Sequence, residues 1–131
     1  MSEIHDDPFD LNRFVNAQSN VYSRALSEIE RGRKTSHWMW YIFPQVKGLG
    51  RSYESRLYAI SGLEEARAYL SHEILGSRLR ECVLTLLTLE YRTAVEICGA
   101  IDEMKLRSSL TLFRVASDEP IFDRALEKFF E

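Results

Sequence analysis

The spacing of apolar residues is the feature that most constrains the fold of this chain. Apolar side chains recur at intervals of three and four residues over most of its 131 positions, which is the spacing of an amphipathic α-helix. Alternating runs of β-branched residues, which are typical of strands, are absent from the sequence. We therefore predict an all-α protein, with six or seven helices in a single compact domain that spans residues 1–131.

The bounds of the predicted helices follow from residues that start and stop helices. The first helix runs from Leu11 to Ile29, with Asp10 as its N-cap and Gly32 as its stop. A short aromatic helix, His37 to Phe43, comes next, and a loop follows it. We expect residues 1–8 to be flexible. The remaining predicted helices are Ser61–Leu70, Ile74–Glu90, Thr93–Cys98, Ile101–Ala116 and Ile121–Phe130.

Composition and charge exclude several classes of protein. An apolar fraction of 45% excludes intrinsic disorder as the main state. The longest apolar stretch is too short to span a membrane, and the acidic N-terminus is unlike a secretion signal, so we expect a cytoplasmic protein. Cys82 and Cys98 are too far apart for a CxxC pair, and we expect both thiols to be reduced.

The common motifs of catalysis and cofactor binding are also absent. The sequence has no GxGxxG, Walker A or GxSxG string, and its three histidines lack the spacing of metal ligands. We therefore expect neither a metal nor a cofactor. A sequence pI near 5.7 does not favour an extended nucleic-acid surface. We expect a monomer or a weak dimer.

Positive charge gathers in one segment of this otherwise acidic chain. Residues 31–56 carry a net charge of +5, although the whole chain carries −3. In this segment Arg33 and Lys34 precede Trp38 and Trp40, and a cation beside an aromatic plane suits a nucleotide or another planar anion. A plainer interpretation also fits, in which the cations are solvated charges at a helix end and both tryptophans belong to the core.

A lysine interrupts the apolar face of the long helix that is predicted to end at Ala116. One apolar arc of this helix is formed by Ile101, Met104, Leu112, Val115 and Ala116 and is extended by Leu106, Leu110 and Phe113. Lys105 and Ser109 fall inside that arc. Burying an unpaired ammonium group costs several kcal/mol. Lys105 is therefore either a candidate anion ligand in a water-filled groove or the ion-pair partner of Asp102 at the start of the helix.

Four segments resemble the family catalogued as domain of unknown function 1810: DPFDLNRFVNAQ, GRKTSHWMWYIFPQVKGLGRS, YAISGLEEARAYLSHEILGSRLREC and KLRSSLTLF. The resemblance extends from about Asp7 to Phe130, and SHWMWYIFPQ is its most specific motif. It implies a small, mostly helical bacterial protein and no established activity. Some relatives carry the label calpastatin, which does not fit, because calpastatin is disordered and this composition requires a packed core. The hallmark positions of the family fall on Lys34, Ser36, His37, Trp38, Trp40, Phe43, Pro44 and Gln45, and on Lys105, Leu106, Arg107, Ser108, Ser109, Thr111 and Phe113.

Three functions fit these residues. The leading function is binding of a small anionic, nucleotide-like or phosphorylated ligand by Arg33, Lys34, His37, Trp38, Trp40, Gln45, Lys105, Ser108 and Ser109. The second is an enzyme that acts on such a ligand, with His37 as general acid or base. The third is a protein-interaction module with the segment Trp38–Phe43 as an exposed anchor. Flat, open tryptophans favour a partner protein, whereas tryptophans recessed beside Lys105 favour a small ligand.

Overall fold

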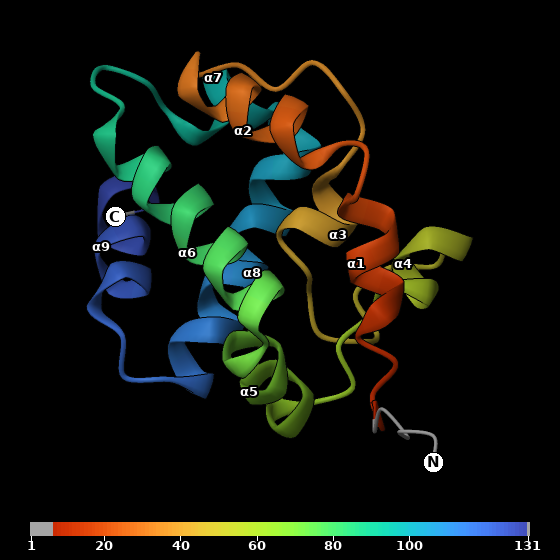
Figure 1. Ribbon diagram of the computed structural model, residues 1–131. Helices are drawn as coiled ribbons and strands as arrows, with labels where there is room; N and C mark the ends of the chain where they lie inside the picture. The colour runs from red at the N-terminus through yellow and green to blue at the C-terminus, as the bar shows by residue number, and fades with distance from the viewer. Residues whose placement is uncertain (1–6, 131) are drawn as a thin grey trace.

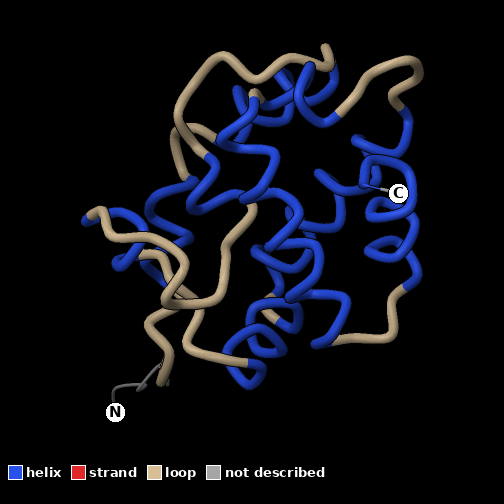
Figure 2. The backbone as a smooth tube through the Cα atoms, turned by 180° about the vertical axis from the view of Figure 1, so that it is seen from behind, coloured by secondary structure: helices blue, strands red, loops and turns tan. Residues whose placement is uncertain are grey.

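The computed structural model describes residues 7–130, and within this range every named element is a helix (Figures 1 and 2). The prediction of an all-α fold in one compact domain is confirmed. Outside the helices, a single isolated bridge joins Val46 to Ile60. Of the segment 1–8 that was expected to be flexible, residues 1–6 lie outside the described residues. The helices are α1 Asn12–Gln18, α2 Tyr22–Glu30, α3 Met39–Ile42, α4 Tyr53–Leu57, α5 Leu63–Ser71, α6 Glu73–Thr88, α7 Ala94–Cys98, α8 Ala100–Ala116 and α9 Pro120–Phe130.

Helix α8 occupies the middle of the molecule and positions most of the other elements. It packs against α5, α7 and α9, and it also contacts α3, a helix from the first half of the chain (Figure 1). Helix α6 contacts α1, α2, α5 and α9. The fully buried side chains between these helices are mainly aromatic and aliphatic, and Phe14, Trp38, Tyr69 and Phe113 are among the largest.

The prediction of one helix from Leu11 to Ile29 was wrong, because the chain breaks into α1 and α2 after Gln18. The Gln18 side chain is buried, and its amide donates to the Tyr41 carbonyl at 2.7 Å and to the Tyr69 hydroxyl at 3.1 Å. These tertiary contacts outweigh the continuous apolar spacing. Asp10 is also not the N-cap: it has a positive φ of 52°, and the Asp7 carboxylate accepts from the backbone N–H groups of Leu11 and Asn12.

Short helices account for the other differences in the number and bounds of elements. Six of the helices in the described range have seven or more residues, and the three others have four or five. The predicted helix His37–Phe43 shrinks to Met39–Ile42, and Tyr53–Leu57 was not predicted as a helix at all. A helix of one turn does not repeat often enough for its apolar period to be recognised.

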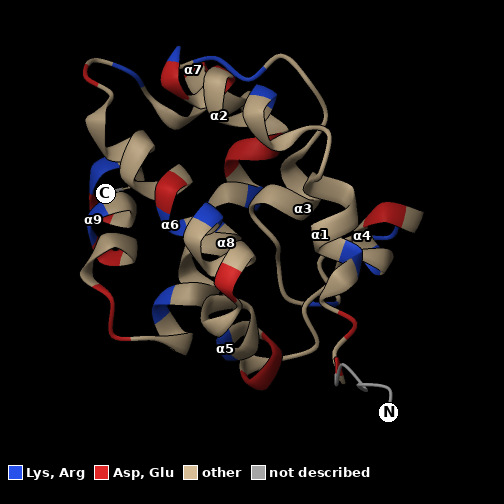
Figure 3. Ribbon diagram, in the orientation of Figure 1, with Lys and Arg blue, Asp and Glu red and all other residues tan. Residues whose placement is uncertain are grey.

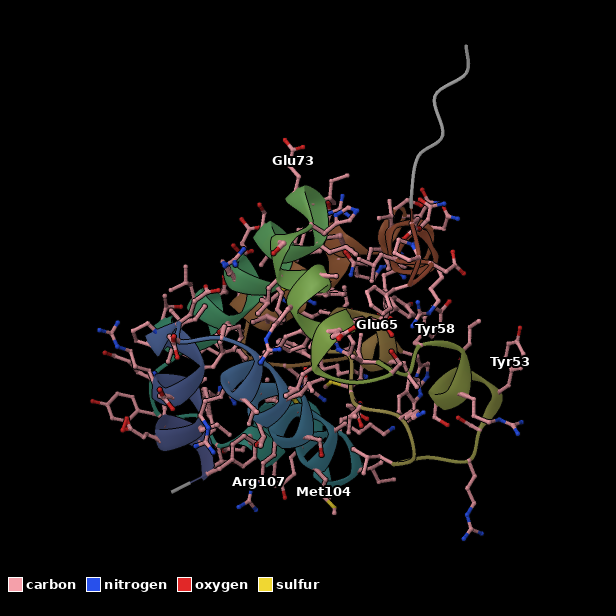
Figure 4. All side chains as sticks on the ribbon, turned by 90° about the horizontal axis from the view of Figure 1, so that it is seen from below. Tyr53, Tyr58, Glu65, Glu73, Met104 and Arg107 are labelled. Atoms are coloured by element: carbon pink, nitrogen blue, oxygen red, sulfur yellow. The ribbon has the colours of Figure 1, made fainter. Side chains whose placement is uncertain are left out.

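The buried face of α8 includes only part of the predicted arc. Ile101, Met104 and Val115 are 75%, 70% and 55% exposed, and Figure 4 shows Met104 projecting outward beside Arg107. The buried face consists of the other arc residues, Leu106, Leu110, Leu112, Phe113 and Ala116, together with Ser109. Helices α5, α7 and α9 pack against α8. Both cysteines are free, as expected. No helix in the described part of the chain has the length and apolar composition of a membrane span.

Candidate functional site

The segment between α2 and α3 is built around one buried carboxylate, that of Glu28. Helix α2 ends in a tight turn at Gly32, which has a φ of +73°, and the Arg33 N–H donates to the Glu28 carbonyl at 3.0 Å. The turn brings the following residues back alongside α2. There the Glu28 carboxylate accepts hydrogen bonds from the Thr35 N–H at 2.8 Å, the Ser36 N–H at 2.9 Å, the Ser36 hydroxyl at 2.6 Å and the Trp38 indole at 2.9 Å.

These four hydrogen bonds control the ionisation of Glu28. Burial alone raises the pKa of this carboxyl, but the donors from Ser36, Thr35 and Trp38 outweigh burial and lower the pKa to about 2. Glu28 is 1% exposed and therefore carries a buried negative charge that the neighbouring backbone and side chains satisfy.

The stability of the fold is expected to depend on this charge at acidic pH. Because the pKa of Glu28 is lower in the folded protein than its ordinary value of 4.5, the carboxylate stabilises the fold above pH 4.5, and this contribution is lost as the pH falls towards 2. The contribution is about 3 kcal/mol when fully present. In chemical denaturation, the difference in unfolding free energy between wild type and Glu28→Gln should approach this value at pH 7 and shrink towards zero near pH 2. A difference that does not change with pH would contradict the assignment.

The segment held by Glu28 presents Lys34 to the start of α8. The Lys34 N–H donates to the Ile97 carbonyl at 2.7 Å, which ties the segment to α7. Its ammonium group donates to the Ser36 carbonyl at 2.6 Å and pairs with Asp102 Oδ2 at 2.8 Å. The same ammonium lies 5.1 Å from the centroid of the Trp38 ring.

Lys105 approaches the same carboxylate from one turn further along α8. Its ammonium group lies 3.2 Å from Asp102 Oδ1 and 4.3 Å from the centroid of the Trp40 ring. Burial raises the pKa of Asp102, but the hydrogen bonds and charges of Lys34 and Lys105 outweigh it, so that the pKa lies below its ordinary value. We call Lys34, Asp102 and Lys105 the lysine–aspartate triad.

A cleft of about 260 Å³ opens on the triad, and we call it the triad cleft. A neighbouring depression of about 580 Å³ shares four of its residues, Lys34, His37, Asp102 and Lys105, and extends to the first residues of α8. Figure 3 shows the run of basic residues that follows α2 and leads into this region. The cleft is lined by Lys34, His37, Trp38, Met39, Trp40, Tyr41, Glu54, Asp102 and Lys105.

Five of the predicted site residues meet in the triad cleft, and four do not. Lys34, His37, Trp38, Trp40 and Lys105 line it. The other four lie elsewhere. Arg33 is exposed, Gln45 and Ser109 are buried, and Ser108 lines an apolar groove with Arg107 and Val115. Within the described range, the Gln45 side-chain nitrogen and the Ser109 hydroxyl are buried without a hydrogen-bond partner.

The two tryptophans have different environments. Trp38 is 2% exposed and donates its indole N–H to Glu28, so it belongs to the core as the plainer interpretation held. Trp40 is half-buried, and the Lys105 ammonium covers one face of its ring. Trp38, Met39, Ile42 and Phe43 are all buried, so the segment does not form a flat, open anchor for a partner protein.

Sequence reasoning missed Glu28, Tyr41 and Glu54. Glu28 lies on the buried face of α2 with Ala25 and Ile29. Its position on the apolar face of this helix was the sequence signal that could have identified it as a buried carboxylate. Nothing in the local sequence places Glu54 near the cleft, because α4 reaches it through the tertiary fold.

A larger depression elsewhere is less suited to bind a ligand. About 750 Å³ in volume, it lies between residues 7–12 and the end of α5. Two of its polar side chains already accept backbone hydrogen bonds. The Asp7 carboxylate accepts from the N–H groups of Leu11 and Asn12, and His72 Nδ1 accepts from those of Ile74 and Leu75. No group of three or more potential metal ligands occurs among the described residues.

The fold and the triad cleft define a small helical domain with two lysines gathered on one recessed carboxylate. The chain belongs to the family described as protein of unknown function (DUF1810), whose model matches residues 8–131, and the predicted resemblance is thereby confirmed. It is similar to the conserved hypothetical protein Rv1873 from Mycobacterium tuberculosis, whose crystal structure was determined at 1.38 Å. The two chains are 49% identical with a TM-score of 0.93, and the match covers 95% of this chain and 89% of that chain. No curated protein matches the sequence.

Proposed function

We propose that this protein binds a small phosphate-bearing ligand in the triad cleft, through the ammonium groups of Lys34 and Lys105. The observation that carries the proposal is that both ammonium groups approach one carboxylate, at 2.8 Å and 3.2 Å. The triad therefore has one positive charge in excess. An ammonium group has three N–H donors, and among the described residues Lys105 uses only one of them, on Asp102. Lysine ammonium groups are common partners of phosphate oxygens.

The surroundings of the triad support an anionic ligand in a recessed position. The neighbouring depression borders the first residues of α8, Gly99 to Ile101, where backbone N–H groups carry the positive end of the helix dipole. His37 lines both depressions and can add a hydrogen bond. Base stacking receives less support, because Trp38 is buried and Lys105 already lies over Trp40.

The enzyme hypothesis, with His37 as general acid or base, stays a hypothesis. Within residues 7–130 no carboxylate is hydrogen-bonded to the His37 imidazole to orient it, and general acid–base catalysis depends on such positioning.

Lys105→Met tests the proposal. Methionine keeps the packing over Trp40 and Asp102 keeps Lys34 as its partner, so the unfolding free energy of the empty protein should change by less than about 1 kcal/mol. A thermal-shift screen with inorganic phosphate, sugar phosphates, nucleotides and ADP-ribose should find a compound that stabilises wild type. At a hundred times its Kd, that compound contributes about 2.7 kcal/mol. Lys105→Met should lose this stabilisation.

Lys47→Met is the matched control, because Lys47 is an exposed lysine from the same basic segment and does not line the cleft. It should keep the full ligand shift. If Lys105→Met melts lower when empty and still gains the full shift, Lys105 is a structural residue and the proposed site is wrong.

A further inference from the structure

The triad cleft is lined by two cations, Lys34 and Lys105, and by two anions, Asp102 and Glu54. Among the described residues, Asp102 is the anion that forms ion pairs with these lysines. The Asp102 carboxylate forms an ion pair with each ammonium group and so takes up one hydrogen-bonding position on each. Its side chain is 17% exposed, so bulk water screens it incompletely. An anionic ligand that reaches Lys105 therefore meets the lysines and the Asp102 carboxylate together.

We infer that Asp102 restricts this site to a singly charged oxyanion, namely a phosphate that is esterified twice or lies within a pyrophosphate linkage. The inference rests on the proposed function and names the ligand class of the same site. A singly charged phosphate balances the excess charge of the triad. A terminal phosphate monoester is doubly charged above about pH 7, since its second pKa lies near 6. Its second charge has no cation left to balance it, lies close to the Asp102 carboxylate and costs additional hydration on binding.

Asp102 also has a structural role that makes a different prediction. It lies in the first turn of α8, where the helix dipole favours a carboxylate whatever the ligand. A purely structural Asp102 would affect stability alone. An Asp102 that selects the ligand affects singly and doubly charged compounds by different factors.

The experiment compares three small aromatic probes at pH 8 by calorimetry or by ligand-observed NMR. Methyl phenyl phosphate carries one charge, phenyl phosphate carries two, and benzoate is a singly charged carboxylate of similar size. The proteins are wild type, Asp102→Asn, Asp102→Ser and Lys105→Met. Glu103→Gln is the matched control, because it changes the net charge equally on the same helix turn and does not line the cleft.

Wild type should bind methyl phenyl phosphate at least threefold more tightly than phenyl phosphate. Neutralising Asp102 should tighten both. Because Coulomb energy is proportional to ligand charge, the factor gained by the doubly charged probe is the square of the factor gained by the singly charged one, for example about tenfold against threefold. The wild-type preference should therefore disappear in Asp102→Asn and persist in Glu103→Gln.

The outcomes separate this inference from the proposed function. Equal or tighter binding of phenyl phosphate by wild type overturns the inference, as does an equal gain for both phosphates in Asp102→Asn. If both Asp102 variants fail to fold, the relative affinity of wild type for methyl phenyl phosphate and phenyl phosphate tests the inference by itself. Binding that is unchanged in Lys105→Met, or absent for all three probes in wild type, overturns the proposed function itself. If wild type binds benzoate more tightly than methyl phenyl phosphate, the site prefers a singly charged ligand, but its ligand class is a carboxylate and the proposed phosphate is wrong.

Discussion

Glu28→Ala is expected to destabilise the protein by about 4 kcal/mol or more, and to lower its melting temperature by about 15 °C. The substitution removes the acceptor of four hydrogen bonds, which come from Thr35, Ser36 and Trp38. Two of the donors are backbone N–H groups and one is a buried indole, and each unsatisfied buried donor costs about 1–3 kcal/mol. Since single domains of this size are stable by only about 5–15 kcal/mol, the loss is a large share of the total.

The expected loss can be assigned to the hydrogen bonds by two further variants. Glu28→Gln keeps an acceptor oxygen in place, so it should be less destabilising than Glu28→Ala. Glu30→Ala removes an exposed glutamate from the same helix and should change the unfolding free energy by less than about 0.5 kcal/mol. Urea denaturation at pH 7 measures all three. A Glu28→Ala variant as stable as Glu30→Ala would show that the segment carrying Lys34 is held by other contacts.

Arg13→Met is expected to cost about 3–5 kcal/mol, because it leaves the buried carboxylate of Glu65 without its partner. The Arg13 guanidinium lies 2.8 Å from Glu65 Oε2 and also donates to the carbonyls of Leu57 and Ala59, at 2.7 Å and 2.8 Å, and to those of Phe9 and Asp10. It therefore joins α1 to the end of α4, to the segment that follows α4 and to α5. Glu65 is 3% exposed and its other oxygen accepts from the Ser61 N–H, so water does not replace the guanidinium.

A double-mutant cycle tests this explanation. Adding Glu65→Gln to Arg13→Met removes the unpaired buried charge and should recover part of the lost stability. Arg24→Met is the control, since Arg24 is an exposed arginine on α2. If Arg13→Met costs less than about 1 kcal/mol, the Arg13–Glu65 pair does not hold these segments together.

The long helices could be predicted from the sequence because each repeats its apolar period several times. The bounds of α6, α8 and α9 differ from their predicted ranges by at most two residues at either end. The turn at Gly32 was predicted for a similar local reason, since glycine adopts a positive φ without strain. Where a decision rested on contacts between distant segments, as at the break after Gln18, the prediction was wrong.

The candidate site was predictable in part. Lys34, His37 and Trp40 were selected from the basic, aromatic segment, and Lys105 because it interrupts an apolar arc; the fold brings all four into one cleft. Ser108 and Ser109 were included as hydrogen-bonding groups at hallmark positions about one turn after Lys105. Ser109 is fully buried in the core and Ser108 lines the apolar groove with Arg107, so neither serine lines the cleft.

The sequence by itself determined the all-helical class, the family and the two segments that supply the cleft, because apolar period, composition and motifs are local properties. Only the tertiary structure decided which part of the apolar arc of α8 is buried and which residue balances each charge. Asp102 pairs with both Lys34 and Lys105, although Lys34 lies far from it in the chain. Glu28 satisfies donors from a segment that folds back onto its own helix. Such pairings depend on distances that arise when helices pack against one another, and those distances are not encoded in any short stretch of sequence.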